Sequence, residues 1–183
     1  MGVRTGRRAP ARACVGAHGR MSGEIAAQPL TPAAFAPFGD VLQVVGLPDR
    51  IINQGLCGRY HDLARIDTGG GRAGISLFSA EPRRLPYRLE MLERHPLGSQ
   101  AFLPMSLHPF LVIVAPDDSG VPGRPVAFVT TPGQGINLHR GTWHGVLTPL
   151  HAPGLFAVVD RIGTEANLEE HWLATPFIIT ARP

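Results

Sequence analysis

Short apolar segments, separated by turns rich in glycine and proline, make up most of the chain. Residues 75–79 alternate between apolar and polar side chains, which is the pattern of a strand with one buried face. Residues 110–115 form a continuous apolar run. Further short apolar segments are found at 41–45, 100–105, 126–130 and 155–160. Strands at such short and regular spacing indicate a barrel or a double-sheet jelly roll.

Helical signals are few. Thr31 followed by Pro32 offers an N-cap and a first helical residue, so we expect a short helix to begin there. Residues 87–95 have high helix propensity, yet they lie between prolines at a length that suits a strand, and the pattern leaves both open. Beyond Asn167 we expect a short helix before the apolar residues 177–179. The chain is therefore predicted to be all-β with a few short peripheral helices.

The chain length fits one domain. A chain of 183 residues can bury roughly 70% of the surface that it exposes when unfolded. Residues 1–20 are rich in Arg and Ala and contain no acidic residue, so we interpret them as a disordered tail, or as sequence that precedes a true start at Met21. Residues 21–183 are expected to form the single functional domain.

The charged residues exclude several functions. Five of the 17 basic residues lie in the first 20 positions, and without them the formal charge falls from +3 to −2. The basic pI therefore gives no reason to expect nucleic-acid binding, because the rest of the chain has no basic stripe. All basic residues are Arg, so the lysine that Schiff-base chemistry or a P-loop requires is absent.

Cysteine content and hydropathy bear on the compartment. The two cysteines, Cys14 and Cys57, are isolated, so neither a disulfide framework nor a thiolate zinc site is expected. No segment approaches the ~20 consecutive apolar residues of a membrane span. We expect a cytoplasmic protein with no membrane partner.

Histidine and carboxylate side chains suggest a metal site. Glu93 and His95 would share one face of a strand, and a turn at 96–99 could bring Gln100 beside them. Together with His144, these side chains suit a divalent metal such as Ni, Zn, Mn or Fe. The alternative is that His95, just before a turn, is simply solvated and that the Gln100 amide is too weak a ligand.

A second polar cluster combines residues 53–55 with residues 59–62. Here Arg59 could meet a carboxylate, and His61 or Asp62 could handle a proton. The plainer interpretation is a surface loop with an ordinary Arg and Asp pair. Trp143, beside His144, is expected to fill space in the barrel mouth.

Seven segments carry a family resemblance: 30–32, 35–40, 53–55, 59–64, 89–102, 131–144 and 159–161. In this order and at this spacing they resemble ureidoglycolate lyases, from about Leu30 to His171. The resemblance implies a cupin-like jelly-roll barrel that forms a homodimer, with nickel as the associated metal. The implied reaction is the cleavage of (S)-ureidoglycolate to glyoxylate and urea, in the breakdown of allantoin from purines.

The resemblance also implies a ligand set. Glu93 and His95 take the positions of the two histidines of the general cupin pattern, Gln100 takes that of the glutamate, and His144 that of the second-motif histidine. His139 stands where that motif has proline. Where family members commonly continue with another histidine after Trp143 and His144, this chain has Gly145.

The implied reaction sets three tasks: binding the substrate carboxylate, removing one proton and supplying another. The expected substrate-binding residues are Arg59, Tyr60 and Arg140. The two arginines are the candidates for the carboxylate, since guanidinium groups form paired, charge-assisted hydrogen bonds. The candidates for proton transfer are His61, His139 and His144, because imidazole titrates near neutral pH. If His144 binds metal, His139 or His61 must move protons.

Two other functions stay open. One is a ureidoglycolate amidohydrolase, which would release ammonia, although such enzymes assemble richer His and Asp clusters. The other is a non-catalytic cupin that binds a small carboxylate. A cupin isomerase or dioxygenase is disfavoured because the two-histidine motif is incomplete.

Overall fold

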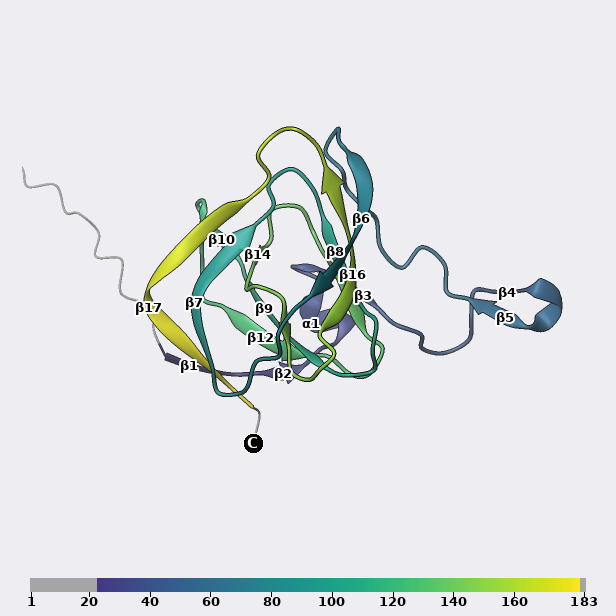
Figure 1. Cartoon of the computed structure of the whole chain (residues 1–183), viewed down its shortest axis with the longest axis horizontal. Helices are drawn as coiled ribbons and strands as arrows, with labels where there is room; N and C mark the ends of the chain where they lie inside the picture. The colour runs from purple at the N-terminus through teal and green to yellow at the C-terminus, as the bar shows by residue number, and fades with distance from the viewer. Residues whose placement is uncertain (1–22, 182–183) are drawn as a thin grey trace, which may run out of the picture.

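The computed structural model describes residues 23–181 and is built almost entirely of strands (Figure 1). The prediction for residues 1–20 lies outside the described part. The larger sheet has the strand order β1-β17-β7-β14-β9-β12-β2, with β15 also paired to β9. Its strands are β1 (Gly23–Ala26), β2 (Gln28–Pro29), β7 (Tyr87–Arg94), β9 (Phe110–Ala115), β12 (Val126–Val129), β14 (Trp143–His144), β15 (Thr148–Pro149) and β17 (Glu169–Thr180).

The smaller sheet has five strands in the order β3-β13-β8-β16-β6. They are β3 (Gly39–Leu42), β6 (Arg72–Ser79), β8 (Gln100–Pro104), β13 (Gly135–Leu138) and β16 (Leu155–Ile162). Two short hairpins, a helix and a 3-10 turn complete the fold: β4 (Arg50–Ile52) with β5 (Cys57–Arg59), β10 (Asp117–Asp118) with β11 (Val121–Pro122), α1 (Pro32–Phe35) and η1 (Asn53–Gly55). The predicted all-β, cupin-like jelly roll is confirmed.

Strand β9 lies at the centre of the core. All six of its residues are buried, as expected of a continuous apolar run. Phe110, Val112 and Val114 belong to one core cluster, which they share with the smaller sheet through Phe102 and Phe156. The other face of β9 packs into a second cluster, formed with residues of β1, β7 and β17. Successive side chains of a strand point to opposite faces, so one strand serves both clusters.

Two connections cross between the sheets at the same end of the barrel. Residues 95–99 lead from β7 in the larger sheet to β8 in the smaller one, and residues 139–142 lead from β13 in the smaller sheet to β14 in the larger one. The two crossings are in contact, because the Gly141 amide donates a hydrogen bond of 2.9 Å to the carbonyl of His95. Functional side chains on either crossing are thereby brought to one place.

Helix α1 begins as expected, with the Thr31 side chain accepting a hydrogen bond from the Ala34 amide. Residues 87–94, which the sequence leaves open, form strand β7. The helix expected beyond Asn167 is wrong: Glu169–Thr180 is the long strand β17, which pairs with β7 on one side and β1 on the other. Pairing on both sides satisfies its backbone, which overrides local propensity.

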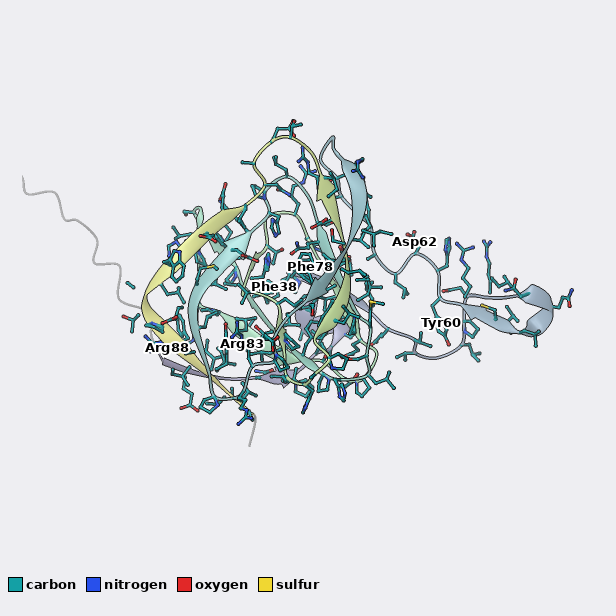
Figure 2. All side chains as sticks on the ribbon, viewed as in Figure 1. Phe38, Tyr60, Asp62, Phe78, Arg83 and Arg88 are labelled. Carbon is teal, nitrogen blue, oxygen red and sulfur yellow. The ribbon has the colours of Figure 1, made fainter. Side chains whose placement is uncertain are left out.

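Residues 43–66 leave the barrel and form an arm that ends in the β4–β5 hairpin (Figures 1 and 2). The strand predicted at 41–45 therefore ends at Leu42, where the chain departs from the smaller sheet. Several large apolar side chains of the arm face solvent, with Leu47 93% and Leu56 88% exposed. Within residues 23–181, no helix is long and apolar enough to cross a membrane.

Candidate metal and substrate site

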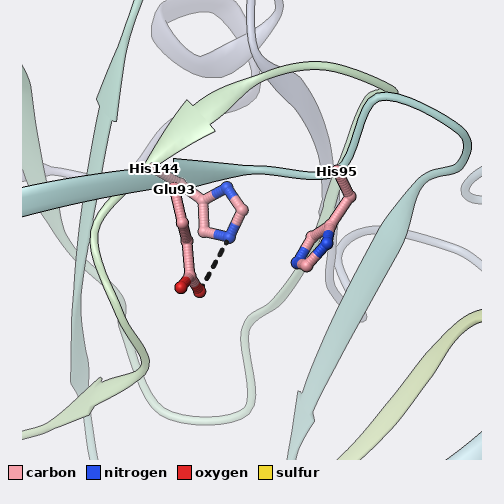
Figure 3. Close-up of side chains that lie close together, drawn as sticks. All are labelled: Glu93, His95 and His144. Atoms are coloured by element: carbon pink, nitrogen blue, oxygen red, sulfur yellow. Dashed lines mark ion pairs between the residues drawn. The ribbon is translucent and has the colours of Figure 1, made fainter. Parts of the chain in front are cut away.

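Glu93, His95 and His144 come together at the barrel end where the two crossings meet (Figure 3). One potential ligand atom from each lies within 4.8 Å of the others. Glu93 and His144 stand directly opposite each other on β7 and β14, and His95 follows at the start of the crossing. Three of the four predicted ligands are thus brought together by strand pairing and one turn.

Backbone carbonyls fix the orientation of both imidazole rings. Nδ1 of His95 lies 2.5 Å from the carbonyl oxygen of Asn167, and Nδ1 of His144 lies 2.9 Å from that of Thr142. A carbonyl oxygen only accepts hydrogen bonds, so Nδ1 is the donor in each ring, and Nε2 is the nitrogen left to bind a metal. This is the arrangement found in metal-binding histidines, in which the second ring nitrogen is held by an acceptor.

The electrostatics of the site also favour a cation. Oε1 of Glu93 lies 3.5 Å from Nε2 of His144. This neighbour holds the pKa of the Glu93 carboxyl below its ordinary value, against the opposing effect of partial burial, and His95 adds to the lowering. Within residues 23–181, Nε2 of His144 is buried with no hydrogen-bond partner. Two imidazole nitrogens and one carboxylate form a donor set that fits a divalent transition metal.

Gln100, the fourth predicted ligand, is held by an acidic residue that the sequence did not single out for chemistry. Its side-chain amide donates a hydrogen bond of 3.3 Å to Oδ2 of Asp160 on the neighbouring strand β16. Asp160 could have been found from the alternation of residues 156–160, which places a carboxylate on the same strand face as the buried Phe156 and Val158.

His139 and Arg140 lie on the second crossing, in a separate polar pocket lined by Arg65, Asp67, Ser99, His139 and Arg140. Nε2 of His139 is 3.4 Å from Oδ2 of Asp40, and the Arg140 guanidinium is paired with Asp67. That hydrogen bond is the main reason that the pKa of Asp67 is below its ordinary value. Asp67 therefore already neutralises part of the charge predicted to bind a carboxylate.

Arg59, Tyr60 and His61 are all on the arm, away from the barrel end that holds the metal candidates (Figure 2). The Tyr60 hydroxyl donates a hydrogen bond of 2.9 Å to the carbonyl of Gly46. The His61 amide donates one of 2.8 Å to Asp49. These bonds join the outgoing and returning segments of the arm on either side of the hairpin. Within a single chain, the structure does not bring the arm residues to the metal candidates.

Trp143, next to His144 in sequence, packs in the hydrophobic core, in line with its predicted packing role. It is buried in the core, and its indole N–H donates a hydrogen bond of 2.9 Å to Asp117. The guanidinium carbon of Arg94 lies 4.4 Å from the centre of the indole ring, and Arg94 pairs with Asp117 and Glu169. Local sequence would place Arg94 on a solvated face, but its side chain is only 19% exposed, because its neighbours come from strands distant in sequence.

Comparisons with known proteins agree over nearly the whole described chain. A family model described as ureidoglycolate lyase matches residues 22–180. A ureidoglycolate lyase of Rhodobacter capsulatus is 62% identical over 153 residues, which is 83% of this chain and 95% of that protein. Ureidoglycolate lyase 2 of Rhizobium meliloti is 52% identical over 152 residues, or 82% and 93% of the two chains. A ureidoglycolate lyase of Chelativorans sp. is 52% identical over 158 residues, or 85% and 96%.

Proposed function

The chain belongs to the ureidoglycolate lyase family, and we propose that it cleaves (S)-ureidoglycolate into glyoxylate and urea. The observation that carries this proposal is the family match over residues 22–180, which includes every residue of the candidate site. The reaction belongs to the breakdown of allantoin, and we place it in the cytoplasm, where the exposed free thiol of Cys57 would stay reduced.

The chemistry of the substrate defines what the site must do. One carbon of ureidoglycolate carries a hydroxyl, a carboxylate and the ureido nitrogen. Loss of the hydroxyl proton allows that C–O bond to become a carbonyl while the C–N bond breaks. The departing nitrogen takes up a proton and leaves as urea, so no water is consumed. The protein must therefore bind a carboxylate, accept one proton and supply one.

Glu93, His95 and His144 would hold a divalent cation, with nickel as our candidate. When bound, such a cation would polarise the substrate hydroxyl and lower its pKa. The two carbonyl-bonded rings present Nε2 without rearrangement, which supports this assignment. Gln100, the predicted fourth ligand, turns its amide group to Asp160, and we leave it out of the proposed ligand set.

If His144 is a ligand, another histidine must move protons. We propose His139 for this role, because its side chain is about half exposed, with Nε2 3.4 Å from Asp40, and lies on the crossing that leads to His144. Arg140 lines the same pocket and is proposed to bind the substrate carboxylate, in competition with its present partner Asp67.

The arm supports a homodimer. Leu47 and Leu56 on the arm face solvent, as do Ile75 and Leu77 on the outer face of the smaller sheet. Two such surfaces on one chain can cover each other reciprocally across a two-fold axis. We propose that the arm residues Arg59, Tyr60 and His61 contribute to substrate binding and proton transfer only in this assembly.

Product analysis tests the proposed function. Incubation with (S)-ureidoglycolate should give glyoxylate and urea in equal amounts and no ammonia. Stoichiometric ammonia would instead identify an amidohydrolase. Binding of glyoxylate without turnover at any metal loading would identify a non-catalytic cupin.

A further inference from the structure

Buried Gln100 and half-buried Asp160 form a polar pair to which the proposed mechanism gives no role. We propose that this pair recognises the ureido group of the substrate, with Asp160 as a substrate-recognition residue. The proposal rests on the proposed function, and it fixes which way the substrate lies in the barrel.

The pair faces the same part of the core as the metal candidates. Asp160 alternates along β16 with the core residues Phe156 and Val158, so its side chain points to the same face of the strand. His144 is paired in register with Val114, which belongs to that same core cluster and shares its sheet face with His144. The two sheets thus direct these polar groups toward one interior.

The pair also lies at the same end of the barrel as the metal candidates. Gln100 is the first residue of β8 and is reached from His95 through the crossing at 95–99. Asp160 stands directly beside Gln100 in the sheet register. Leu138, on the other side of Gln100, lines an apolar cavity that His144 also lines. The polar pair and the metal candidates are therefore neighbours around the same interior space.

The hydrogen bonding of the pair leaves two acceptors unused. A carboxylate only accepts hydrogen bonds, so the Gln100 amide must direct its NH₂ group to Asp160 and its oxygen elsewhere. In the part of the chain that the structure describes, Oε1 of Gln100 and Oδ1 of Asp160 are both buried and neither has a partner. Burying an unpaired acceptor is costly, and two adjacent ones indicate a ligand that supplies donors.

The ureido group is the donor-rich end of the substrate. It carries three N–H bonds, whereas the carboxylate end offers only acceptors and would be repelled by Asp160. The geometry therefore orients the ureido group toward β8 and β16, and it leaves the hydroxyl and the carboxylate on the side of His144 and the crossings. Urea, as the departing product, would leave from the β16 side.

Asp160→Asn tests the assignment, because it keeps the shape and replaces one acceptor with a donor. We expect the KM for ureidoglycolate to rise by about 10- to 100-fold, the range for a lost hydrogen bond to a charged group. Inhibition by glyoxylate, which has no ureido group, should be unchanged, and so should the metal content measured by elemental analysis. Asp118→Asn, an exposed carboxylate on β10, is the matched control and should leave all three values unchanged.

Gln100→Met is the second variant, which removes an acceptor while filling the same space. It should likewise raise the KM for ureidoglycolate and leave inhibition by glyoxylate unchanged. If Asp160→Asn does not fold, this variant alone tests the proposal. Equal weakening of substrate and glyoxylate, loss of metal, or an unchanged KM in the folded variants would overturn the proposal. A wild-type enzyme that does not cleave ureidoglycolate would instead defeat the proposed function, and this inference with it.

Discussion

The barrel end that holds Glu93, His95 and His144 and the arm of residues 43–66 carry similar side chains in opposite surroundings. At the barrel end, His144 is buried and its ring is fixed by a backbone carbonyl. On the arm, Arg59 and His61 are exposed, and the large apolar side chains beside them have no cover in this chain. The comparison teaches that one chain is sufficient to preorganise the first region, whereas the second needs a surface that one chain does not supply.

The largest expected effect comes from removing the preorganised imidazole. His144→Ala should lower kcat/KM by at least about 100-fold, because it removes a group proposed to bind the metal next to the reacting hydroxyl. His151→Ala, an exposed histidine elsewhere, is the matched control and should leave kcat/KM within twofold. Steady-state kinetics on folded protein measures both. Equal activity of the two variants would remove the distinction between the barrel end and the surface.

Loss of the proposed carboxylate contacts should have a smaller effect. Arg140→Ala and Arg59→Ala should each raise the KM, with a cost of about 1.5 to 3 kcal/mol for a lost charged hydrogen bond. We expect Arg140→Ala to fall at the lower end, because Asp67 already occupies part of that guanidinium. Unchanged kinetics in both variants would rule out the anion-binding role.

The metal candidates and the central strand could be predicted from local sequence, whereas the residues that contact them from distant strands could not. Strand alternation places Glu93 and His95 on one face, and the apolar run of β9 identifies the central strand from local sequence alone. Local alternation places Asp160 on the same strand face as core residues, but its contact with Gln100, 60 residues away in sequence, is nonlocal. Likewise, β17 is a strand because it pairs with β7 and β1, and such pairing is nonlocal. The sequence motifs also gave no indication that residues 43–66 leave the barrel as an arm.

Asp117, which accepts a hydrogen bond from Trp143 beside the site, should make the stability of the protein depend on pH. The indole of Trp143, the Gly120 amide and Arg94 hold the pKa of Asp117 below its ordinary value in the folded state. A depressed folded-state pKa means that this stabilisation is present above the unfolded pKa and is lost as the pH falls through the folded one. Denaturant unfolding at stepwise lower pH should show a smaller loss for Asp117→Asn than for the wild type. Parallel curves for the two proteins would contradict this.

The smallest effect on the fold should come from the arm. Replacing Leu47 and Leu56 together by Ser should change the stability of the barrel by less than about 0.5 kcal/mol, since both are exposed in the single chain. The same change should convert the proposed homodimer to monomers, as measured by analytical ultracentrifugation. Thr164→Ser, an exposed position outside the arm, is the control. A dimer that survives the double replacement would exclude this surface as the interface.

The central claim is that the barrel end is a metal-dependent lyase site, and metal analysis combined with chelator titration tests it most directly. Elemental analysis of the purified enzyme should find about one divalent ion per chain, carried by Glu93, His95 and His144. Removal of the ion should abolish production of glyoxylate and urea, nickel should restore it, and His144→Ala should lose both metal and turnover. Full activity in protein that contains no stoichiometric metal would contradict the account.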